Sequence, residues 1–261
     1  YFIDNQYYFK RGSLYGHYDD AERFAFFSRA VLEIIPLIDF KPDIIHCNDW
    51  QTAMIPVYKD RYYHDGVYKN IKTVFTIHNI QYQGKYGYEL MKDVLGLGDD
   101  SAHLVEYENC VNLMKGAIEC SEKFSTVSPT YANEIKTAQY AHGLQSVICK
   151  NAAKLTGVLN GIDVNSYDPT TDKALFANYS PDNFEGKAVC KKELQKMLGL
   201  PEKDVPMIAM ITRLVSHKGI ELVKTVAEDI LHEDLQFVLL GTGDTAYENY
   251  FRDLGKRYEN K

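Results

Sequence analysis

The sequence predicts an α/β protein built from two doubly wound parallel sheets, both of them incomplete within its 261 residues. Short apolar runs rich in β-branched residues alternate with amphipathic stretches of helical length, a pattern typical of right-handed βαβ units. A polar, loop-rich stretch from about residue 160 to 185 separates one series of such units from a second series. We therefore expect a first domain over residues 1–162 and a second domain that starts at residue 163 and runs to residue 261.

The first domain is predicted to contain four short, buried, parallel strands. They are expected at residues 43–47, 73–77, 123–127 and 155–159. Helices are expected over residues 50–60 and 104–119, where apolar residues recur with helical spacing. Another helix should start at Pro129, because Ser128 is a favourable N-cap and proline is favourable at the first helical position.

The second domain begins with a charged helix, which is expected over residues 186–198 and should end at Gly199-Leu200-Pro201. Two strands are predicted to follow. The first, over residues 206–212, is apolar enough to be strongly buried, and the second covers residues 235–240. A helix over residues 219–231 connects them, and Asp244 is expected to cap a final helix.

Composition excludes several classes of protein. The net charge of −7 argues against a nucleic-acid-binding surface, and no apolar run is long enough to span a membrane. Five scattered cysteines without metal-like spacing indicate reduced thiols and a cytoplasmic protein. The chain starts without methionine and stops on a helical pattern, so we expect the whole protein to be longer.

Polar or glycine-rich residues follow five of the predicted strands. These segments are Asn48-Asp49-Trp50, His78-Asn79, Asn160-Gly161-Ile162-Asp163, Arg213 with Lys218, and Gly241-Thr242-Gly243-Asp244. In open parallel sheets, ligands bind beyond the carboxyl ends of the strands. The sequence therefore predicts that these segments form a ligand site.

Two of these segments suit phosphate groups. Arg213 and Lys218 provide two cations at a strand end and near the start of a helix, whose N-terminus also attracts anions. A solvated pair of cations on a surface loop is the simpler alternative. The segment Gly241–Ala246 fits the pattern G-x-G-x-x-A, which keeps a dinucleotide-binding oxidoreductase open. A βα unit precedes it, however, so a turn facing a phosphate or a sugar is favoured over that fingerprint, with a plain tight turn as the alternative.

His78 and Asp49 suit contacts to sugars. A neutral histidine can hydrogen-bond a sugar hydroxyl or an anionic leaving group, although a histidine at this position is often structural. Asp49 beside Trp50 offers a carboxylate for hydroxyls and an aromatic face for a sugar ring. The alternative is that Asp49 caps a helix starting at Trp50. The sequence contains no serine-hydrolase elbow, zinc-protease motif, P-loop or Asp-x-Asp pair.

Six segments, taken together and in order, resemble the bacterial glycogen synthase and plant starch synthase family. They are His46-Cys47-Asn48-Asp49-Trp50-Gln51, Thr76 to Gly84 (Thr-Ile-His-Asn-Ile-Gln-Tyr-Gln-Gly), Thr126 to Ile135 (Thr-Val-Ser-Pro-Thr-Tyr-Ala-Asn-Glu-Ile), Gly157 to Asp163, Thr212 to Gly219 and Leu240 to Asp244. The resemblance covers about residues 1–255. The segment His78 to Gly84, combined with Val-Ser-Pro-Thr-Tyr, is its most specific part.

This resemblance implies the architecture called GT-B, in which two Rossmann-like domains face a cleft. Residues 1–162 would belong to the N-terminal, acceptor-side domain, and residues 163–261 would begin the domain that binds the nucleotide sugar. The family transfers glucose from ADP-glucose to the non-reducing end of an α-1,4-glucan, with retention and without a metal or other cofactor. Its N-terminal Lys-x-Gly-Gly and C-terminal glutamate motifs are absent from this chain, so the fragment itself is expected to be inactive.

The resemblance also assigns the catalytic roles. Arg213 and Lys218 would hold the donor diphosphate and stabilise the charge that develops as it leaves. His78 would contact the donor glucose near the reacting carbon, and Asp49 would hold sugar hydroxyls. A non-catalytic, glucan-binding relative should have lost Arg213, Lys218 or His78, and all three are present.

The remaining family positions concern binding. Asn160 would hold sugar hydroxyls, and Gly241 and Gly243 would let the backbone approach the nucleotide. Tyr7 and Trp50 would lie at the sugar or acceptor pocket. The alternatives that stay open are another GT-B transferase with a different acceptor and a dinucleotide-binding oxidoreductase.

Overall fold

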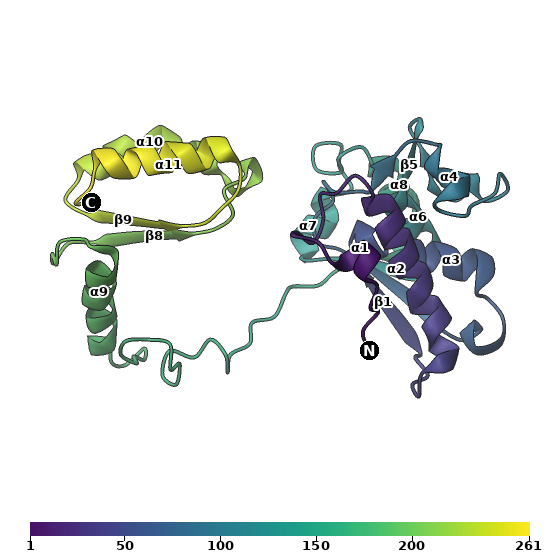
Figure 1. Cartoon of the computed structure of the whole chain (residues 1–261), viewed down its shortest axis with the longest axis horizontal. Coiled ribbons are helices and arrows are strands. Elements are labelled where there is room, and N and C mark those ends of the chain that lie inside the picture. The colour runs from purple at the N-terminus through teal and green to yellow at the C-terminus, as the bar shows by residue number, and fades with distance from the viewer. The chain divides into compact units, whose positions relative to one another are not determined.

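The computed structural model describes every residue from Tyr1 to Lys261 and divides into two compact units (Figure 1). The first unit is Tyr1–Gly161 and the second is Ile162–Lys261. Both units contain helices and parallel strands, so the predicted α/β class describes each of them.

A four-stranded parallel sheet organises the first unit. Its strands are β1 (Ile44–Asn48), β2 (Lys72–Ile77), β6 (Lys123–Thr126) and β7 (Leu155–Gly157), in the order β1-β2-β6-β7. All four predicted strands are present. Because β1 and β2 are neighbours, the residues that follow them come to the same edge of the sheet.

Eight helices accompany this sheet in the first unit. They are α1 (Gln6–Phe9), α2 (Asp20–Ile34), α3 (Met54–Tyr62), α4 (Leu90–Asp93), α5 (Ala102–Val105), α6 (Leu113–Cys120), α7 (Pro129–Glu134) and α8 (Gln145–Lys150). Short 3₁₀ turns lie at Ile35–Leu37 (η1), Trp50–Thr52 (η2), Gly66–Tyr68 (η3) and Ala152–Lys154 (η4). Helix α3 packs on both α2 and α6, and Phe75 and Phe124 from the sheet are fully buried in the same core. As predicted, Ser128 caps α7: its hydroxyl accepts a hydrogen bond from the backbone N–H of Tyr131.

The prediction of one helix over residues 104–119 was wrong. A hairpin of β4 (Glu106–Tyr107) and β5 (Cys110–Asn112) separates α5 from α6, and β5 also pairs with β3 (Lys85–Tyr86). Glu108 and Asn109 form the turn, both with positive φ (48° and 60°), which suits a two-residue hairpin connection. The Asn112 side chain then caps α6 by accepting from the backbone N–H of Lys115.

The second unit has a two-stranded parallel sheet of β8 (Met207–Ile211) and β9 (Gln236–Leu240). Its helices are α9 (Glu185–Leu198), α10 (Ile220–His232) and α11 (Thr245–Arg257), with a 3₁₀ turn η5 at Ser216–Lys218. Helix α9 ends at Gly199 in the left-handed conformation (φ 68°), as its sequence predicted. Figure 1 shows α10 and α11 lying along one face of this sheet.

Strand β8 is less buried than its apolar sequence predicted. Met210 packs against the α10 and α11 layer, but Ile211 is 75% exposed. The reason is that β8 has only β9 as a neighbour, and alternate residues of a strand point to opposite faces of the sheet. The residues on the face away from α10 and α11 are therefore largely uncovered at this end of the strand.

Two further observations concern the whole chain. No helix combines the length and the apolar character that crossing a membrane would require. All five cysteines are free, with Cys47 buried and Cys149 exposed.

Candidate functional site

Asp49 joins the ends of β1 and β2. Its Oδ1 accepts hydrogen bonds from two consecutive backbone N–H groups, those of His78 (2.8 Å) and Asn79 (3.3 Å). Asp49 itself has φ 55° and ψ −179°, a backbone conformation that is costly for any residue other than glycine. Such strain is tolerated where the surrounding structure fixes the residue, and it is typical of functional sites.

Asp49 does not act as a helix cap, so this alternative from the sequence was wrong. Its side chain makes no cap hydrogen bond to η2. Thr52 closes this turn instead, because its hydroxyl donates to the carbonyl of Asn48 (2.9 Å). The Asp49 carboxylate is thereby left to hold the loop that follows β2.

His78 lies at the edge of a groove of about 400 Å³ that also contains Asn160. The His78 ring is exposed, and its Nε2 lies 2.9 Å from Asn48 Oδ1. The structure thus brings together two residues, His78 and Asn160, that the sequence assigned to sugar binding.

A line of polar side chains crosses three strands within the same groove. His46 Nε2 lies 2.7 Å from the hydroxyl of Thr76, which lies 2.8 Å from the hydroxyl of Ser125. Residues of this kind present hydrogen-bond donors and acceptors that match the hydroxyl groups of a sugar.

Gln83 fixes the loop after His78. It is buried, and its amide group donates to the carbonyl groups of Ile80 (3.0 Å) and His142 (2.9 Å). Its Oε1 accepts from the side chain of Asn112 (2.8 Å). Gln83 therefore has a structural role in the His78 to Gly84 segment, because its side chain holds the loop through these hydrogen bonds.

Gly84 and Trp50 form the other support of this loop. Gly84 has φ 65°, and a Cβ there would lie 2.8 Å from the indole Cε3 of Trp50. Trp50 is half-buried and packs edge-on against Phe24, with Tyr86 on another side. Much of the indole ring that the sequence assigned to sugar binding is therefore in contact with other residues of the protein.

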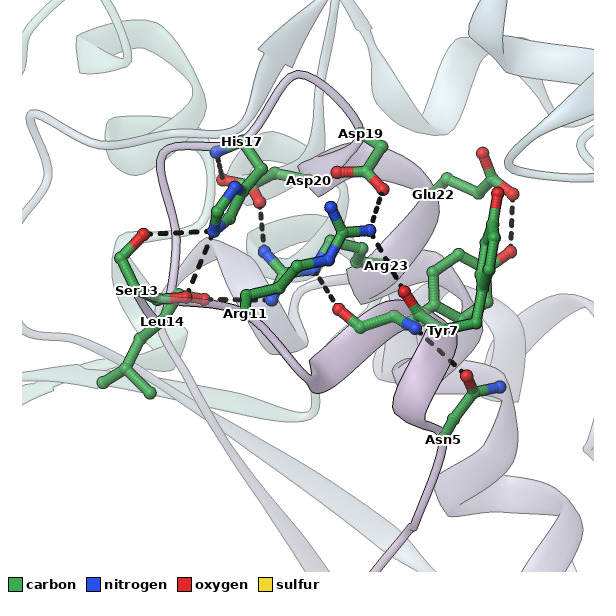
Figure 2. A network of polar contacts seen from close by, with 11 residues as sticks. Asn5, Tyr7, Arg11, Ser13, Leu14, His17, Asp19, Asp20, Glu22 and Arg23 are labelled. Atoms are coloured by element: carbon green, nitrogen blue, oxygen red, sulfur yellow. Dashed lines mark hydrogen bonds and ion pairs between the residues drawn. The ribbon is translucent and has the colours of Figure 1, made fainter.

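Tyr7 is not among the residues that line the His78 groove. It lies in α1, and its side chain is 74% exposed. Figure 2 shows its surroundings, in which the Tyr7 carbonyl accepts from Arg11 (3.1 Å) and Asn5 caps the helix.

Arg23 holds this N-terminal segment in place, a role that the sequence did not reveal. Its guanidinium, almost fully buried in α2, donates to the carbonyl of Tyr8 (2.7 Å) and to the carboxylate of Asp20 (2.5 Å). The other Asp20 oxygen accepts from the backbone of Gly16 (2.6 Å) and His17 (3.2 Å). The contacts in Figure 2 thus tie the loop before α2 to the helix itself. The only signal in the sequence is an aspartate three residues before an arginine.

In the second unit, Arg213 lies two residues after the end of β8, and Lys218 is the last residue of η5. Both side chains are exposed, and neither forms an ion pair. Gly219, with φ 74°, then starts α10. Two cations without acidic partners next to the N-terminus of a 13-residue helix make a suitable site for an anion.

Gly241 and Gly243 allow two strand ends to approach closely. A Cβ at Gly241 would lie 2.0 Å from the carbonyl oxygen of Thr212, and one at Gly243 would lie 2.2 Å from that of Leu214. Leu214 also donates to the carbonyl of Thr242 (2.8 Å). The two glycines therefore have a structural role within the protein in addition to any contact with a ligand.

Asp244 occupies the N-cap position of α11, but its side chain makes no cap hydrogen bond. The predicted cap was therefore wrong. The backbone N–H of Asp244 donates to the carbonyl of Leu214 (2.8 Å), and Glu248 accepts from the N–H of Gly243 (2.9 Å). Because of these bonds, the backbone around the Gly241 turn is held by internal partners.

The chemistry available in each unit is now clear. The strand ends of the first unit offer amide, imidazole and carboxylate groups that suit sugar hydroxyls, whereas those of the second unit offer cations that suit phosphate. No group of three or more histidine, cysteine or acidic residues is placed to hold a metal ion.

Comparisons with known proteins identify the family to which the chain belongs. Residues 1–150 match the family described as the starch synthase catalytic domain. Glycogen synthases of Clostridium novyi and Alkaliphilus metalliredigens are 49% and 50% identical to this chain over its whole length. The chain spans 56% of each of these relatives.

A solved structure supports the same assignment. The catalytic domain of starch synthase IV from Arabidopsis thaliana, bound to ADP and acarbose, matches 97% of this chain with a TM-score of 0.89 and 37% identity. The match covers 53% of that chain. The predicted fold class, with two Rossmann-like parallel-sheet units, and the predicted family are thus both confirmed. The chain belongs to the glycogen and starch synthase family of glycosyltransferases.

Proposed function

We propose that the whole protein transfers glucose from ADP-glucose to the non-reducing end of an α-1,4-glucan, with retention of the anomeric configuration. The observation that carries this proposal is the pair Arg213 and Lys218. In a chain of the glycogen synthase family, both remain at a strand end beside a helix N-terminus, exposed and without an acidic partner. This is the arrangement that a leaving diphosphate requires.

The related starch synthase IV structure supports ADP-glucose as the donor. That structure contains ADP, which is the group that leaves when ADP-glucose gives up its glucose. In the proposed reaction, the bond between glucose C1 and the diphosphate oxygen breaks while a glucan hydroxyl oxygen bonds to C1. The hydroxyl proton is released with ADP. Arg213 and Lys218 stabilise the negative charge that the diphosphate gains.

In this proposal the first unit positions the sugars. His78 contacts the donor glucose, Asn160 binds hydroxyl groups, and Asp49 holds the His78 loop through Oδ1, which leaves Oδ2 for a sugar hydroxyl. Tyr7 and Trp50 belong to the acceptor side. Trp50 also supports Gly84, so it contributes to packing as well as to binding.

The two glycines and the absence of a cofactor complete the proposal. Gly241 and Gly243 give the nucleotide access to the backbone of the strand end. No metal or other cofactor is required, because the two cations supply the charge stabilisation that a metal ion otherwise provides. The whole protein is proposed to act in the cytoplasm, without nucleic-acid or membrane partners. The chain of 261 residues alone, which spans 56% of its relatives, is expected to be inactive.

Donor comparison tests this function. The whole protein is incubated with glycogen and either ADP-glucose or UDP-glucose, with and without a metal chelator. We expect elongation of α-1,4 chains, faster with ADP-glucose and unaffected by the chelator. A transferase with another acceptor would release ADP without elongating glycogen. An oxidoreductase, which the family assignment does not support, would bind NADH in a titration.

A further inference from the structure

The His78 ring is held by a residue outside the set assigned to sugar binding. Asn48, the last residue of β1, places its Oδ1 2.9 Å from Nε2 of His78. The next residue, Asp49, holds the backbone N–H of His78. Two consecutive residues at the end of β1 thus fix both the ring and the main chain of one histidine.

Asn48 is itself firmly placed. The Thr52 hydroxyl lies 2.6 Å from the backbone nitrogen of Asn48 and 2.9 Å from its carbonyl oxygen. Asn48 also pairs with Thr76 across the parallel ladder of β1 and β2. The position of its side chain therefore depends on the sheet register and the turn that follows, not on a flexible loop.

The chemistry of this contact selects one form of the histidine. An amide oxygen can only accept a hydrogen bond, so Nε2 of His78 must carry the proton. In a neutral imidazole the other nitrogen, Nδ1, is then an acceptor. An acceptor nitrogen attracts a hydroxyl group and disfavours an anionic oxygen.

We propose that Asn48 is a positioning residue that fixes the orientation and tautomer of His78, so that Nδ1 accepts a hydrogen bond from a hydroxyl of the donor glucose. This proposal rests on the sugar-transfer function proposed above. It also decides between two uses of His78 that the sequence left open. His78 contacts a sugar hydroxyl, and the diphosphate is left to Arg213 and Lys218.

The first test measures the tautomer directly in the 261-residue chain. Long-range ¹H–¹⁵N correlation spectra report both ring nitrogens of each histidine, and His78→Gln identifies the signals of His78 among the eight histidines. We expect two widely separated nitrogen shifts with the proton on Nε2. In Asn48→Leu the two shifts should move toward each other, as the tautomers exchange. In Asn48→Asp, which keeps an acceptor oxygen, they should stay apart at a pH that keeps the ring neutral, because a carboxylate favours the imidazolium, in which both nitrogens carry a proton.

Controls keep this test interpretable. Asn133→Leu makes the same chemical change at an exposed position of α7 and should leave the His78 signals unchanged. Thermal melting of each variant shows whether the fold is intact, and Asn48→Ala, which also removes the acceptor oxygen, replaces Asn48→Leu if that variant does not fold. A proton on Nδ1 in the unmodified chain, or unchanged His78 shifts in a folded Asn48→Leu chain, would overturn the proposal.

The second test measures turnover by the whole protein. Loss of one neutral hydrogen bond to His78 predicts that Asn48→Leu lowers kcat about tenfold with little change in KM for ADP-glucose. Asn48→Asp should recover most of this loss, and Asn133→Leu should behave like the unmodified protein. Equal activity of Asn48→Leu and the unmodified protein would overturn the positioning role. If His78→Ala transferred glucose normally, the proposed role of His78 would fail, whereas the spectra would still decide what Asn48 does to the ring.

Discussion

Replacing Gly84 with alanine tests how the His78 loop is held. Gly84 has φ 65°, and an alanine Cβ would lie 2.8 Å from Cε3 of Trp50 and 3.2 Å from two side-chain carbons of Leu113. An L-residue with positive φ costs about 1 kcal/mol, and overpacking of a rigid indole costs roughly 1–3 kcal/mol more. We therefore expect Gly84→Ala to destabilise the first unit by about 2–4 kcal/mol.

Gly66→Ala is the matched control for Gly84→Ala. Gly66 also has positive φ (58°), but a Cβ there would meet nothing within 4 Å, so only the conformational cost of about 1 kcal/mol remains. Trp50 is the only tryptophan, so its fluorescence in urea titrations reports unfolding at this site. Equal losses for the two variants, or a loss below about 1 kcal/mol for Gly84→Ala, would show that the contact with Trp50 does not constrain the loop.

Three other predictions concern charge and reactivity. Arg213→Ala and Lys218→Ala should each lower turnover of the whole protein by roughly 10²–10³, and losses below about threefold for both would place the diphosphate elsewhere. Cys149 is exposed and should react with a thiol reagent at pH 8. Burial raises the pKa of the Cys47 thiol to about 12, so Cys47 should be protected in the folded chain. Labelling of Cys47 before Cys149 in a mass-spectrometric time course would contradict this prediction. Burial acts to raise the pKa of the Glu119 carboxyl, but two ion-paired lysines outweigh it and lower this pKa below 4.5. The stability that this carboxylate contributes is thus present above pH 4.5 and lost as the pH falls through the lowered pKa. Glu119→Gln should therefore make the melting temperature depend less on pH in the acid range. An unchanged pH dependence would refute this prediction.

The strands were predictable because their residues carry a local signal. Val74, Phe75 and Ile77 lie in a β-branched and aromatic run that leaves no other interpretation, and Ser128-Pro129 marks a helix start. The hairpin at residues 106–112 was not predictable in the same way. Leu104, Tyr107, Val111 and Met114 have helical spacing, and Glu108-Asn109 is a weak turn signal, so periodicity alone favoured the wrong element.

The sequence selected candidate site residues by their position after strands, but it did not predict the contacts between them. The strand-end rule selected Asp49, His78 and Arg213 as candidates. That Asp49 and Asn48 both hold His78 depends on β1 and β2 being neighbours, which no local pattern in the sequence states. The burial of Arg23 depends in the same way on contacts across the fold.

The proposed function is tested by the transfer of labelled glucose from ADP-glucose into glycogen by the whole protein. We expect label in α-1,4 linkage at the non-reducing ends of the glucan. We also expect that Arg213→Ala and Lys218→Ala variants that remain folded lose most of this incorporation. Hydrolysis of ADP-glucose without any label in glycogen, or undiminished incorporation by both variants, would contradict it.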